Sequence, residues 1–139
     1  MLGSAIMKTL EVVAGILYHE GQVLCVQRGK AKFDYIAYKY EFPGGKIEQG
    51  ETPEAALVRE LQEELHKTVK VKPEQLFTEV THQYEDFAVH VRFYLCPVKD
   101  RTLKDSEHMT ITWTWPQDIE KLDWVDADKE IVKKVTEIK

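Results

Sequence analysis

The sequence predicts an α/β fold of the α+β type, in which helices pack on a central mixed β-sheet. Two kinds of pattern carry this prediction. Pairs of β-branched and apolar runs, each separated by a few turn residues, occur in both halves of the chain and are typical of β-hairpins. Between and after them, two stretches have apolar residues at three- and four-residue spacings, which is typical of helices with one buried side.

The length and composition fit one soluble globular domain. The chain has 139 residues, of which 43% are hydrophobic and 31% are charged. A chain of this length buries roughly two-thirds of the surface that its unfolded form exposes. We therefore expect a single domain over residues 1–139, without repeats or linkers. Residues 1–7 contain Gly3 and Ser4 ahead of Met7, a pattern typical of an expression scar or a disordered end.

Charge and cysteine content limit the partners and the compartment. The formal net charge is −5, which disfavours a nucleic-acid polymer or an anionic membrane as partner. No apolar stretch approaches the roughly 20 residues that span a bilayer, and the N-terminus lacks the features of a signal peptide. Cys25 and Cys96 lie in apolar runs, which fits reduced thiols in a core better than a disulfide. We expect a cytoplasmic protein.

The first part of the chain predicts a hairpin followed by loops. Residues 9–19 and 23–26 are largely β-branched or apolar and flank Glu20-Gly21, so we expect a strand, a tight turn and a strand. Residues 29–40 mix Lys, Asp and Tyr without a clear period and predict a flexible loop. The sequence Phe42-Pro43-Gly44-Gly45 then predicts a rigid turn, because proline fixes φ and glycine permits positive φ.

A helix is predicted from Pro53 to about Leu65. The Thr52 hydroxyl can cap free backbone N–H groups, and proline at the first helical position has no N–H that needs a partner. Apolar residues recur on one side of this helix, at Leu57, Val58, Leu61 and Leu65. This side is expected to pack against a sheet.

The rest of the chain predicts a second hairpin, a further strand and two helices. Residues 76–84 and 87–98 each contain β-favouring residues with partial alternation and are separated by an acidic turn. Residues 110–115 predict another strand. A short helix is expected over residues 116–122, and residues 127–138 have apolar positions at helical spacing. Together these elements give a mixed sheet with flanking helices.

Three glutamates gather on one side of the first predicted helix. Positions i, i+3 and i+4 are neighbours on a helix, so Glu60, Glu63 and Glu64 place three carboxylates on one small patch. Like charges at these spacings repel, which indicates that a cation occupies the patch. Mg²⁺ prefers oxygen ligands and commonly shares carboxylates with a substrate phosphate. The sequence therefore predicts a magnesium site, against the simpler alternative of a solvated acidic face.

The segment around these glutamates resembles the Nudix box. The pattern is Gly45, five residues, Glu51, seven residues, Arg59-Glu60-Leu61, one residue and Glu63-Glu64. Further segments resemble the MutT-like subgroup of this family, namely Glu41-Phe42-Pro43, Ser106-Glu107-His108, Trp113 and Ala127-Asp128. The resemblance covers the chain from about Leu10 to Val135 and implies a Nudix-type α/β/α sandwich.

The resemblance implies an enzyme that uses Mg²⁺, with Mn²⁺ as a substitute, to hydrolyse a nucleoside triphosphate to the monophosphate and pyrophosphate. By motif position, the implied metal ligands are the Gly44 carbonyl, Glu60, Glu63, Glu64 and Glu107. The resemblance leaves open whether Glu60 or Glu107 takes the proton from water. It also implies that Arg59 orients a carboxylate through a bidentate contact and that Glu51 anchors the loop to its helix. Ordinary surface charge is the alternative for both.

The substrate depends on residues outside the box. Arg28 and Lys46 resemble positions that contact phosphate in MutT-like enzymes, and Phe42 resembles one that packs against a base. A solvated surface charge and a core aromatic are the respective alternatives. Asp128 matches a position that reads the hydrogen-bonding edge of the base, and its alternative is a helix cap. As a carboxylate, Asp128 would accept hydrogen bonds from a cytosine amino group or a guanine N–H edge.

Two nucleotides and one other class of protein remain open. The stretch from Ser106 to Asp128 is most similar to bacterial CTP pyrophosphohydrolases, which favours CTP or dCTP, including modified cytosines. An oxidised purine such as 8-oxo-dGTP is the second candidate. A non-catalytic nucleotide-binding module is the alternative from another class, and the intact glutamates disfavour it. The expected partner is a small nucleotide, and the sequence does not distinguish a monomer from a dimer.

One part of the box departs from the family pattern. The glycine expected after Glu64-Leu65 is His66, and the following apolar position is Lys67. Glycine there would supply the left-handed conformation that ends a helix, and His is among the residues that tolerate it. No implied metal ligand changes, so we expect turnover to be retained.

Overall fold

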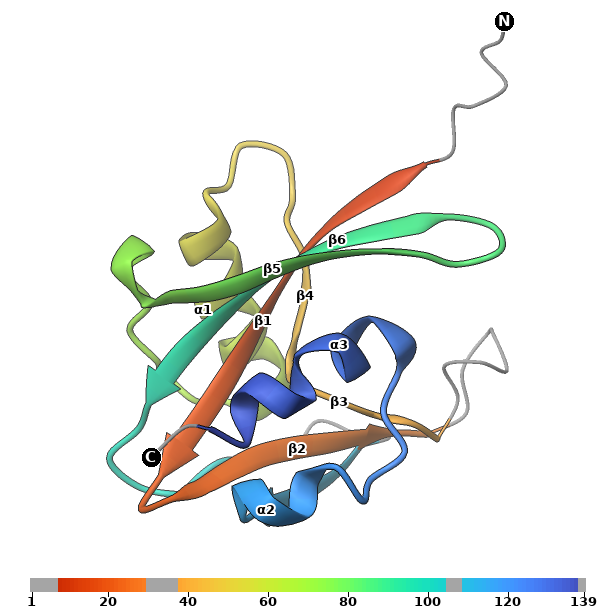
Figure 1. Ribbon diagram of the computed structural model, residues 1–139. Helices are drawn as coiled ribbons and strands as arrows, with labels where there is room; N and C mark the ends of the chain where they lie inside the picture. Colours follow the sequence, from red (N-terminus) through yellow and green to blue (C-terminus); the bar gives the residue numbers. More distant parts are fainter. Residues whose placement is uncertain (1–7, 30–37, 105–108, 138–139) are drawn as a thin grey trace, which may run out of the picture.

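The computed structural model describes residues 8–29, 38–104 and 109–137. These residues form a mixed sheet flanked by helices (Figure 1). The strands are β1 (Thr9–His19), β2 (Gln22–Arg28), β3 (Tyr40–Glu41), β4 (Gly44–Lys46), β5 (Leu76–Gln83), β6 (Ala88–Pro97) and β7 (Met109–Thr114). The helices are α1 (Pro53–Leu65), the 3₁₀ turn η2 (Pro73–Gln75), α2 (Pro116–Ile119) and α3 (Asp126–Val135). None of the described helices is long and apolar enough to cross a membrane.

The sheet is mixed because β1 has a parallel neighbour on one side and antiparallel neighbours on the other. β1 runs parallel to β6 from Thr9 to Tyr18. On its other side, it pairs antiparallel with β4 at Val12–Ala14 and with β2 at Tyr18 and His19. The main strand order is β3-β2-β1-β6-β5, with β4 on β1 and β7 on β2. β2 and β4 thus use different stretches of one edge of β1, and a cavity opens where they part.

Side chains alternate between the two faces of the sheet and build a core on each side. From β1, Val13 and Leu17 join the core that includes α1, whereas Ala14 and Ile16 join the core that includes α2 and α3. The two-residue period of a strand produces this alternation. α1 buries Ala56, Leu57, Leu61 and Leu65. The layers therefore form the expected α/β/α sandwich (Figure 1).

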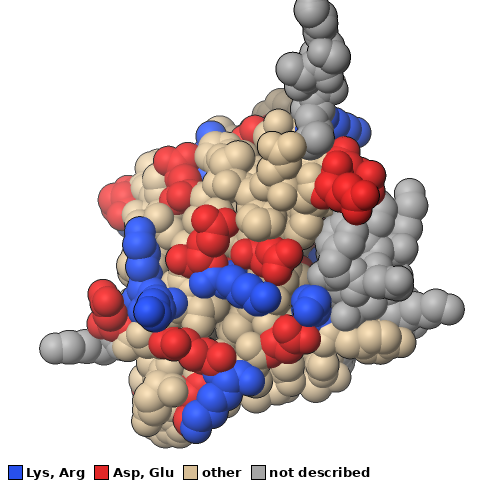
Figure 2. All heavy atoms as spheres, turned by 45° about the vertical axis from the view of Figure 1, so that its right-hand side comes forward, with Lys and Arg blue, Asp and Glu red and all other residues tan. Residues whose placement is uncertain are grey.

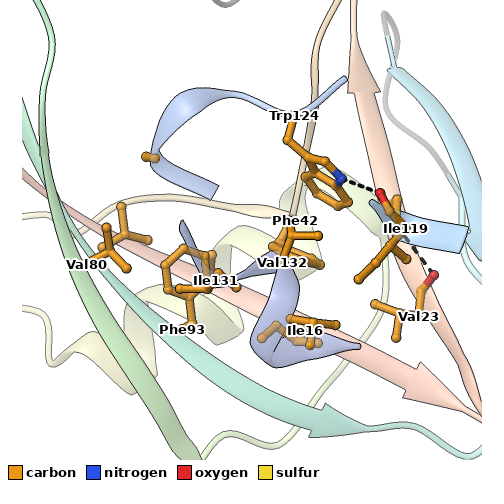
Figure 3. Packing of buried hydrophobic residues seen from close by; sticks show 14 of the residues in the cluster. Ile16, Val23, Phe42, Val80, Phe93, Ile119, Trp124, Ile131 and Val132 are labelled. Carbon is orange, nitrogen blue, oxygen red and sulfur yellow. Dashed lines mark hydrogen bonds between the residues drawn. The ribbon is translucent and has the colours of Figure 1, made fainter. Parts of the chain in front are cut away.

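An aromatic group in the core beside α3 fixes the segment that leads into β4 (Figure 3). The ring centroid of Phe42 lies 4.6 Å from that of Trp124 and 6.1 Å, edge on, from that of Phe93. Trp124 Nε1 donates a hydrogen bond of 2.6 Å to the Ile119 carbonyl. Aromatic pairs of this kind contribute about 0.5–1.5 kcal/mol each beyond the area that they bury. Phe42 therefore anchors the start of the glycine pair.

The predicted hairpins are confirmed, and the predicted turn over residues 42–45 is wrong at its C-terminal end. β1 with β2 and β5 with β6 are antiparallel pairs, as expected. Gly44 and Gly45, however, belong to β4, which pairs with β1. A Cβ on Gly44 would lie 2.0 Å from the Val13 carbonyl oxygen. The glycine here permits close approach of two strands rather than the end of a turn.

The C-terminal helices differ slightly from their predicted bounds. α2 ends at Ile119, because the following bonds, Lys121 N to Asp118 O and Leu122 N to Ile119 O, have the i to i+3 spacing of turns. α3 begins one residue earlier than expected, at Asp126. Both cysteines, Cys25 and Cys96, are buried free thiols, as predicted.

Candidate active site

Both ends of α1 are capped, which fixes the register of its acidic residues. At the N-terminus, the Thr52 hydroxyl accepts a hydrogen bond of 3.1 Å from Ala55 N. At the C-terminus, His66 is left-handed, with φ 53° and ψ 39°, and its N–H donates to the Gln62 carbonyl. His66 therefore ends the helix in the conformation that the glycine of the box would adopt.

Arg59 joins the loop after β4 to the acidic side of α1. Its Nε and Nη2 donate to the two carboxylate oxygens of Glu51 at 2.7 and 3.0 Å, which is the bidentate geometry expected of Arg59. Its Nη1 donates to Glu60 and Glu63, both at 3.1 Å. Nη2 also donates to the Lys46 carbonyl at 3.0 Å. One guanidinium thus ties the loop to two of the predicted ligands.

Charges of both signs lie close together on one face of the molecule. Figure 2 shows Asp and Glu side chains above and below a band of Lys and Arg side chains on that face. Arg59 has a further acidic neighbour besides Glu51, Glu60 and Glu63, since its Nη2 lies 3.5 Å from Glu48 Oε1. Arg59 is thus surrounded by carboxylates, and its charge is compensated within the protein.

Glu64 differs from the other glutamates of α1 because its carboxylate is buried and incompletely paired. Its Oε2 makes no hydrogen bond to any described residue. Burial raises the pKa of Glu64 to about 8, and the negative charges of Glu60 and Glu41 act in the same direction. Arg28 and a hydrogen bond from the Gly44 backbone oppose the shift. Ionised, this carboxylate costs free energy until a cation neutralises it.

The two glycines bring bare backbone against the acidic face of α1. Hydrogen bonds between β4 and β1 are made on either side of Gly44, by Pro43 and Ile47. In an antiparallel ladder this alternation turns the N–H and the carbonyl of Gly44 away from β1. A Cβ on Gly45 would lie 2.4 Å from the carboxyl carbon of Glu60. The Glu60 carboxylate therefore occupies the space that a side chain at position 45 would fill.

These groups fit a divalent cation. Carboxylate and carbonyl oxygens are hard donors, which suit Mg²⁺ or Mn²⁺, and the buried Oε2 of Glu64 has no partner among the described residues. In the described parts of the chain, no three His, Cys, Asp or Glu side chains already surround one point. Arg59 engages both Glu60 and Glu63. Glu107, the further predicted ligand, lies outside the described residues.

A cavity of about 510 Å³ opens beside the carboxylates. Its apolar lining comes largely from β1 and the β5–β6 hairpin, at Leu10, Val12, Tyr84, Phe87, Val89 and Val91. Its charged residues come from four separate segments and are Arg28, Glu41, Lys46 and Asp128. A mostly apolar pocket with a few polar groups is the usual form of a small-molecule site.

Asp128 lines this cavity, yet only 5% of the residue is exposed. Its Oδ2 accepts a hydrogen bond of 2.9 Å from Phe42 N, whereas the N-cap of α3 is Val125. Burial raises the pKa of Asp128 well above its usual range, and the Glu41 carboxylate adds to the shift. The neutral acid, which can donate a hydrogen bond, is therefore favoured. The expectation that Asp128 accepts hydrogen bonds from the base as a carboxylate stays a prediction.

Glu41 is a cavity residue to which the sequence assigns no role. It lies on β3, where its Oε2 accepts a hydrogen bond from Arg28 Nε at the end of β2. Burial raises the pKa of Glu41, and the Arg28 charge opposes the shift. The available signal was an acidic residue directly before the apolar Phe42-Pro43 pair. Nothing in the spacing of the chain indicates that its partner is Arg28.

The other predicted substrate residues lie at the cavity in different ways. Lys46 is exposed on β4, and its ammonium makes no ion pair with any described residue. The Phe42 ring is buried between Trp124 and Phe93, so the alternative of a core aromatic describes its side chain. Its backbone N–H, rather than its ring, contacts Asp128.

Comparison with known proteins agrees with the motif resemblance. The model of the NUDIX domain family matches residues 8–135. The 8-oxo-dGTP diphosphatase of Escherichia coli K12 is 42% identical over 91 residues, which cover 64% of this chain and 67% of that protein. The CTP pyrophosphohydrolase of the same strain is 33% identical over 122 residues, 88% of this chain and 87% of that protein. The solution structure of the E. coli ORF135 protein is similar with a TM-score of 0.77 and 32% identity, covering 96% and 91% of the two chains.

Proposed function

The chain belongs to the NUDIX domain family and is a hydrolase of nucleotide pyrophosphate bonds, and we propose that it cleaves a nucleoside triphosphate to the monophosphate and pyrophosphate with the help of Mg²⁺. The proposed substrate is CTP or dCTP, including modified cytosines. Mn²⁺ is the proposed substitute for Mg²⁺. The nucleotide is expected to be free in the cytoplasm rather than part of a polymer.

The observation that carries this proposal is the buried, unpaired Oε2 of Glu64 beside the bare glycine backbone. We propose that Glu64 holds the cation together with Glu60, Glu63, Glu107 and the Gly44 carbonyl. When bound, the cation would neutralise charge on the phosphate oxygens, which is the main requirement of phosphoryl transfer. Arg59 contacts Glu60 through Oε2, at 3.1 Å, which leaves Oε1 of Glu60 for a cation.

The remaining catalytic roles belong to side chains that position groups or move protons. Glu60 and Glu107 are the two candidates for the base that takes a proton from water. Arg59 and Glu51 hold the loop against α1 through their bidentate contact. Arg28 and Lys46, the two cationic residues of the cavity, are proposed to contact phosphate.

The cavity supports a nucleoside as the other half of the substrate. Its apolar strand residues suit a base and a sugar, and Asp128 supplies one polar group near the base. The similarity to the E. coli CTP pyrophosphohydrolase extends over 88% of this chain, which favours CTP or dCTP. The higher identity of 42% with the 8-oxo-dGTP diphosphatase keeps that nucleotide as the second candidate.

The test is a panel of nucleotides in the presence of Mg²⁺, with release of pyrophosphate measured against release of phosphate. The panel contains CTP, dCTP, 5-methyl-dCTP, 8-oxo-dGTP, GTP and ATP, with CMP, which has no pyrophosphate bond, as the negative control. We expect pyrophosphate release, the highest kcat/KM for a cytosine nucleotide, and loss of turnover in a chelator that Mn²⁺ restores. A higher kcat/KM for 8-oxo-dGTP would select the second candidate. Binding without any turnover would instead support a non-catalytic module.

A further inference from the structure

We propose that Glu41 is a positioning residue that holds the Arg28 guanidinium at the junction of the cavity and the carboxylates of α1. In this position Arg28 can meet a substrate phosphate without occupying the place of the cation. The proposal rests on the proposed function and adds a residue to it.

The strand register places Glu41 within reach of Arg28. β2 and β3 are antiparallel with Val26 opposite Glu41, and Arg28 N donates to the Lys39 carbonyl at 3.0 Å. Arg28 and Glu41 are therefore diagonal neighbours on one face of this strand pair, a separation that long side chains bridge. The hydrogen bond from Arg28 Nε to Glu41 Oε2 closes that gap.

The contact leaves most of the guanidinium free. Only Nε of Arg28 is engaged with a described residue, so the four N–H bonds of its two terminal nitrogens remain as donors. The Arg28 side chain is 44% exposed, whereas that of Glu41 is 17% exposed. Glu41 thus lies on the protein side of the pair and Arg28 on the solvent side. This arrangement presents the remaining donors to an anion that enters the cavity.

Arg28 lies among carboxyl groups that compete for it. The negative charges of Glu41, Glu64 and Glu60 all stabilise its positive charge, with Glu41 the strongest. Arg28 in turn favours the ionised forms of Glu64 and Asp128. A guanidinium released from Glu41 would be attracted to Glu64, whose Oε2 is unpaired. It would then compete with a divalent cation for the same oxygen.

Glu41 therefore has two effects through one contact. It orients the terminal nitrogens of the Arg28 guanidinium toward the substrate phosphates, and it keeps that guanidinium away from Glu64. Because the Glu41 side of the pair is buried, removing the negative charge of Glu41 would also leave the positive charge of Arg28 without its nearest counter-charge. Both effects predict weaker binding of substrate and cation, with the chemical step itself little changed.

The test is a double-mutant cycle of Glu41→Gln and Arg28→Gln. We expect Glu41→Gln to raise KM for CTP and the half-saturating Mg²⁺ concentration about tenfold each, which corresponds to about 1.4 kcal/mol of lost interaction, with kcat within about threefold. In the Arg28→Gln background, Glu41→Gln should have little further effect, because its partner is already absent. Additive losses in the two backgrounds would overturn the proposal. A loss in kcat alone would also overturn it.

A matched control separates positioning from stability. Glu79→Gln removes a strand glutamate that contacts His90 and Arg92 away from the cavity, and it should leave KM unchanged. The thermal midpoint of each variant is recorded, and Glu41→Asp, which keeps the charge on a shorter side chain, should restore part of the Mg²⁺ affinity. If no nucleotide is turned over, the proposed function fails. The double-mutant cycle is then carried out with the dissociation constant for CTP as the measured quantity. Coupling there would support the Arg28–Glu41 contact, and its absence would overturn it.

Discussion

The two ends of the candidate site are built in different ways. The described part of the carboxylate end comes from one continuous segment, residues 44–64, which contains a glycine pair, an arginine that joins loop to helix, and a capped helix. The cavity end combines β1, β2, β3, the β5–β6 hairpin and α3, which lie far apart in the sequence. At the first end charge dominates, whereas the cavity is mostly apolar and its acidic residues, Glu41 and Asp128, are largely buried. The residues proposed for the chemical step are therefore placed by their spacing along one segment, whereas the residues proposed to select the base are placed by the packing of distant segments.

The largest expected effect is at the carboxylate end, in Glu64→Gln. This change keeps the shape of the side chain and removes its charge, so kcat should fall at least about a hundredfold, which is the scale of losing one electrostatic stabiliser. Steady-state pyrophosphate release with Mg²⁺ measures it. Near-normal turnover would remove Glu64 from the ligand set.

Glu64→Gln should increase the stability of the metal-free protein at neutral pH, although it lowers kcat. Since burial raises the pKa of Glu64 to about 8 from 4.5, the folded protein holds a proton that the unfolded chain releases between these values. The stabilisation by that proton is complete below about pH 4.5 and is lost as the pH rises to about 8. Glu64→Gln should therefore flatten the fall of the metal-free thermal midpoint across this range. An unchanged pH slope would contradict the buried environment of Glu64.

Substitution of the two glycines tests whether the position of the Glu60 carboxylate depends on the absence of side chains at residues 44 and 45. In Gly45→Ala, the new Cβ would meet the end of the flexible Glu60 side chain at 2.4 Å, so the fold should tolerate it while Glu60 is displaced. Activity should then fall between about tenfold and a hundredfold, the scale of a misplacement of about 1 Å. In Gly44→Ala, the Cβ would meet the Val13 backbone at 2.0 Å and should reduce stability itself. Thermal midpoints and kcat of both variants measure the contrast. Equal loss of stability in both would contradict it.

The same contrast explains what the sequence could predict. Glu60, Glu63 and Glu64 occupy one helical side by spacing alone, and the Thr52 cap sets where that helix begins. The sequence does not predict β4, because a three-residue strand made largely of glycine carries no β-favouring pattern. The burial that favours the neutral acid at Asp128 comes from the packing of distant segments. No local pattern could report it.

Asp128→Asn tests the cavity end and should have a smaller effect. A neutral acid and an amide both accept the Phe42 N–H through an oxygen and offer a donor at the second position. We therefore expect the ratio of kcat/KM for CTP and 8-oxo-dGTP to stay within about threefold, because the amide keeps both the acceptor and the donor of the neutral acid. Asp128→Ala leaves the Phe42 N–H without its partner and should lower kcat/KM about tenfold. An inverted preference in Asp128→Asn would show that the carboxylate form reads the base.

The smallest expected effect is at the end of α1, in His66→Gly. His66 has φ 53°, and a left-handed conformation costs an ordinary residue about 1 kcal/mol. Glycine avoids that cost but loses about 0.5 kcal/mol more entropy on folding, so the variant should gain about 0.5 kcal/mol. The thermal midpoint should then rise by roughly 2 °C, while kcat changes less than about twofold because no predicted ligand is touched. His66→Ala keeps the left-handed cost and should show no such rise. A hundredfold rise in kcat for His66→Gly would instead show that the helix end limits the carboxylate end.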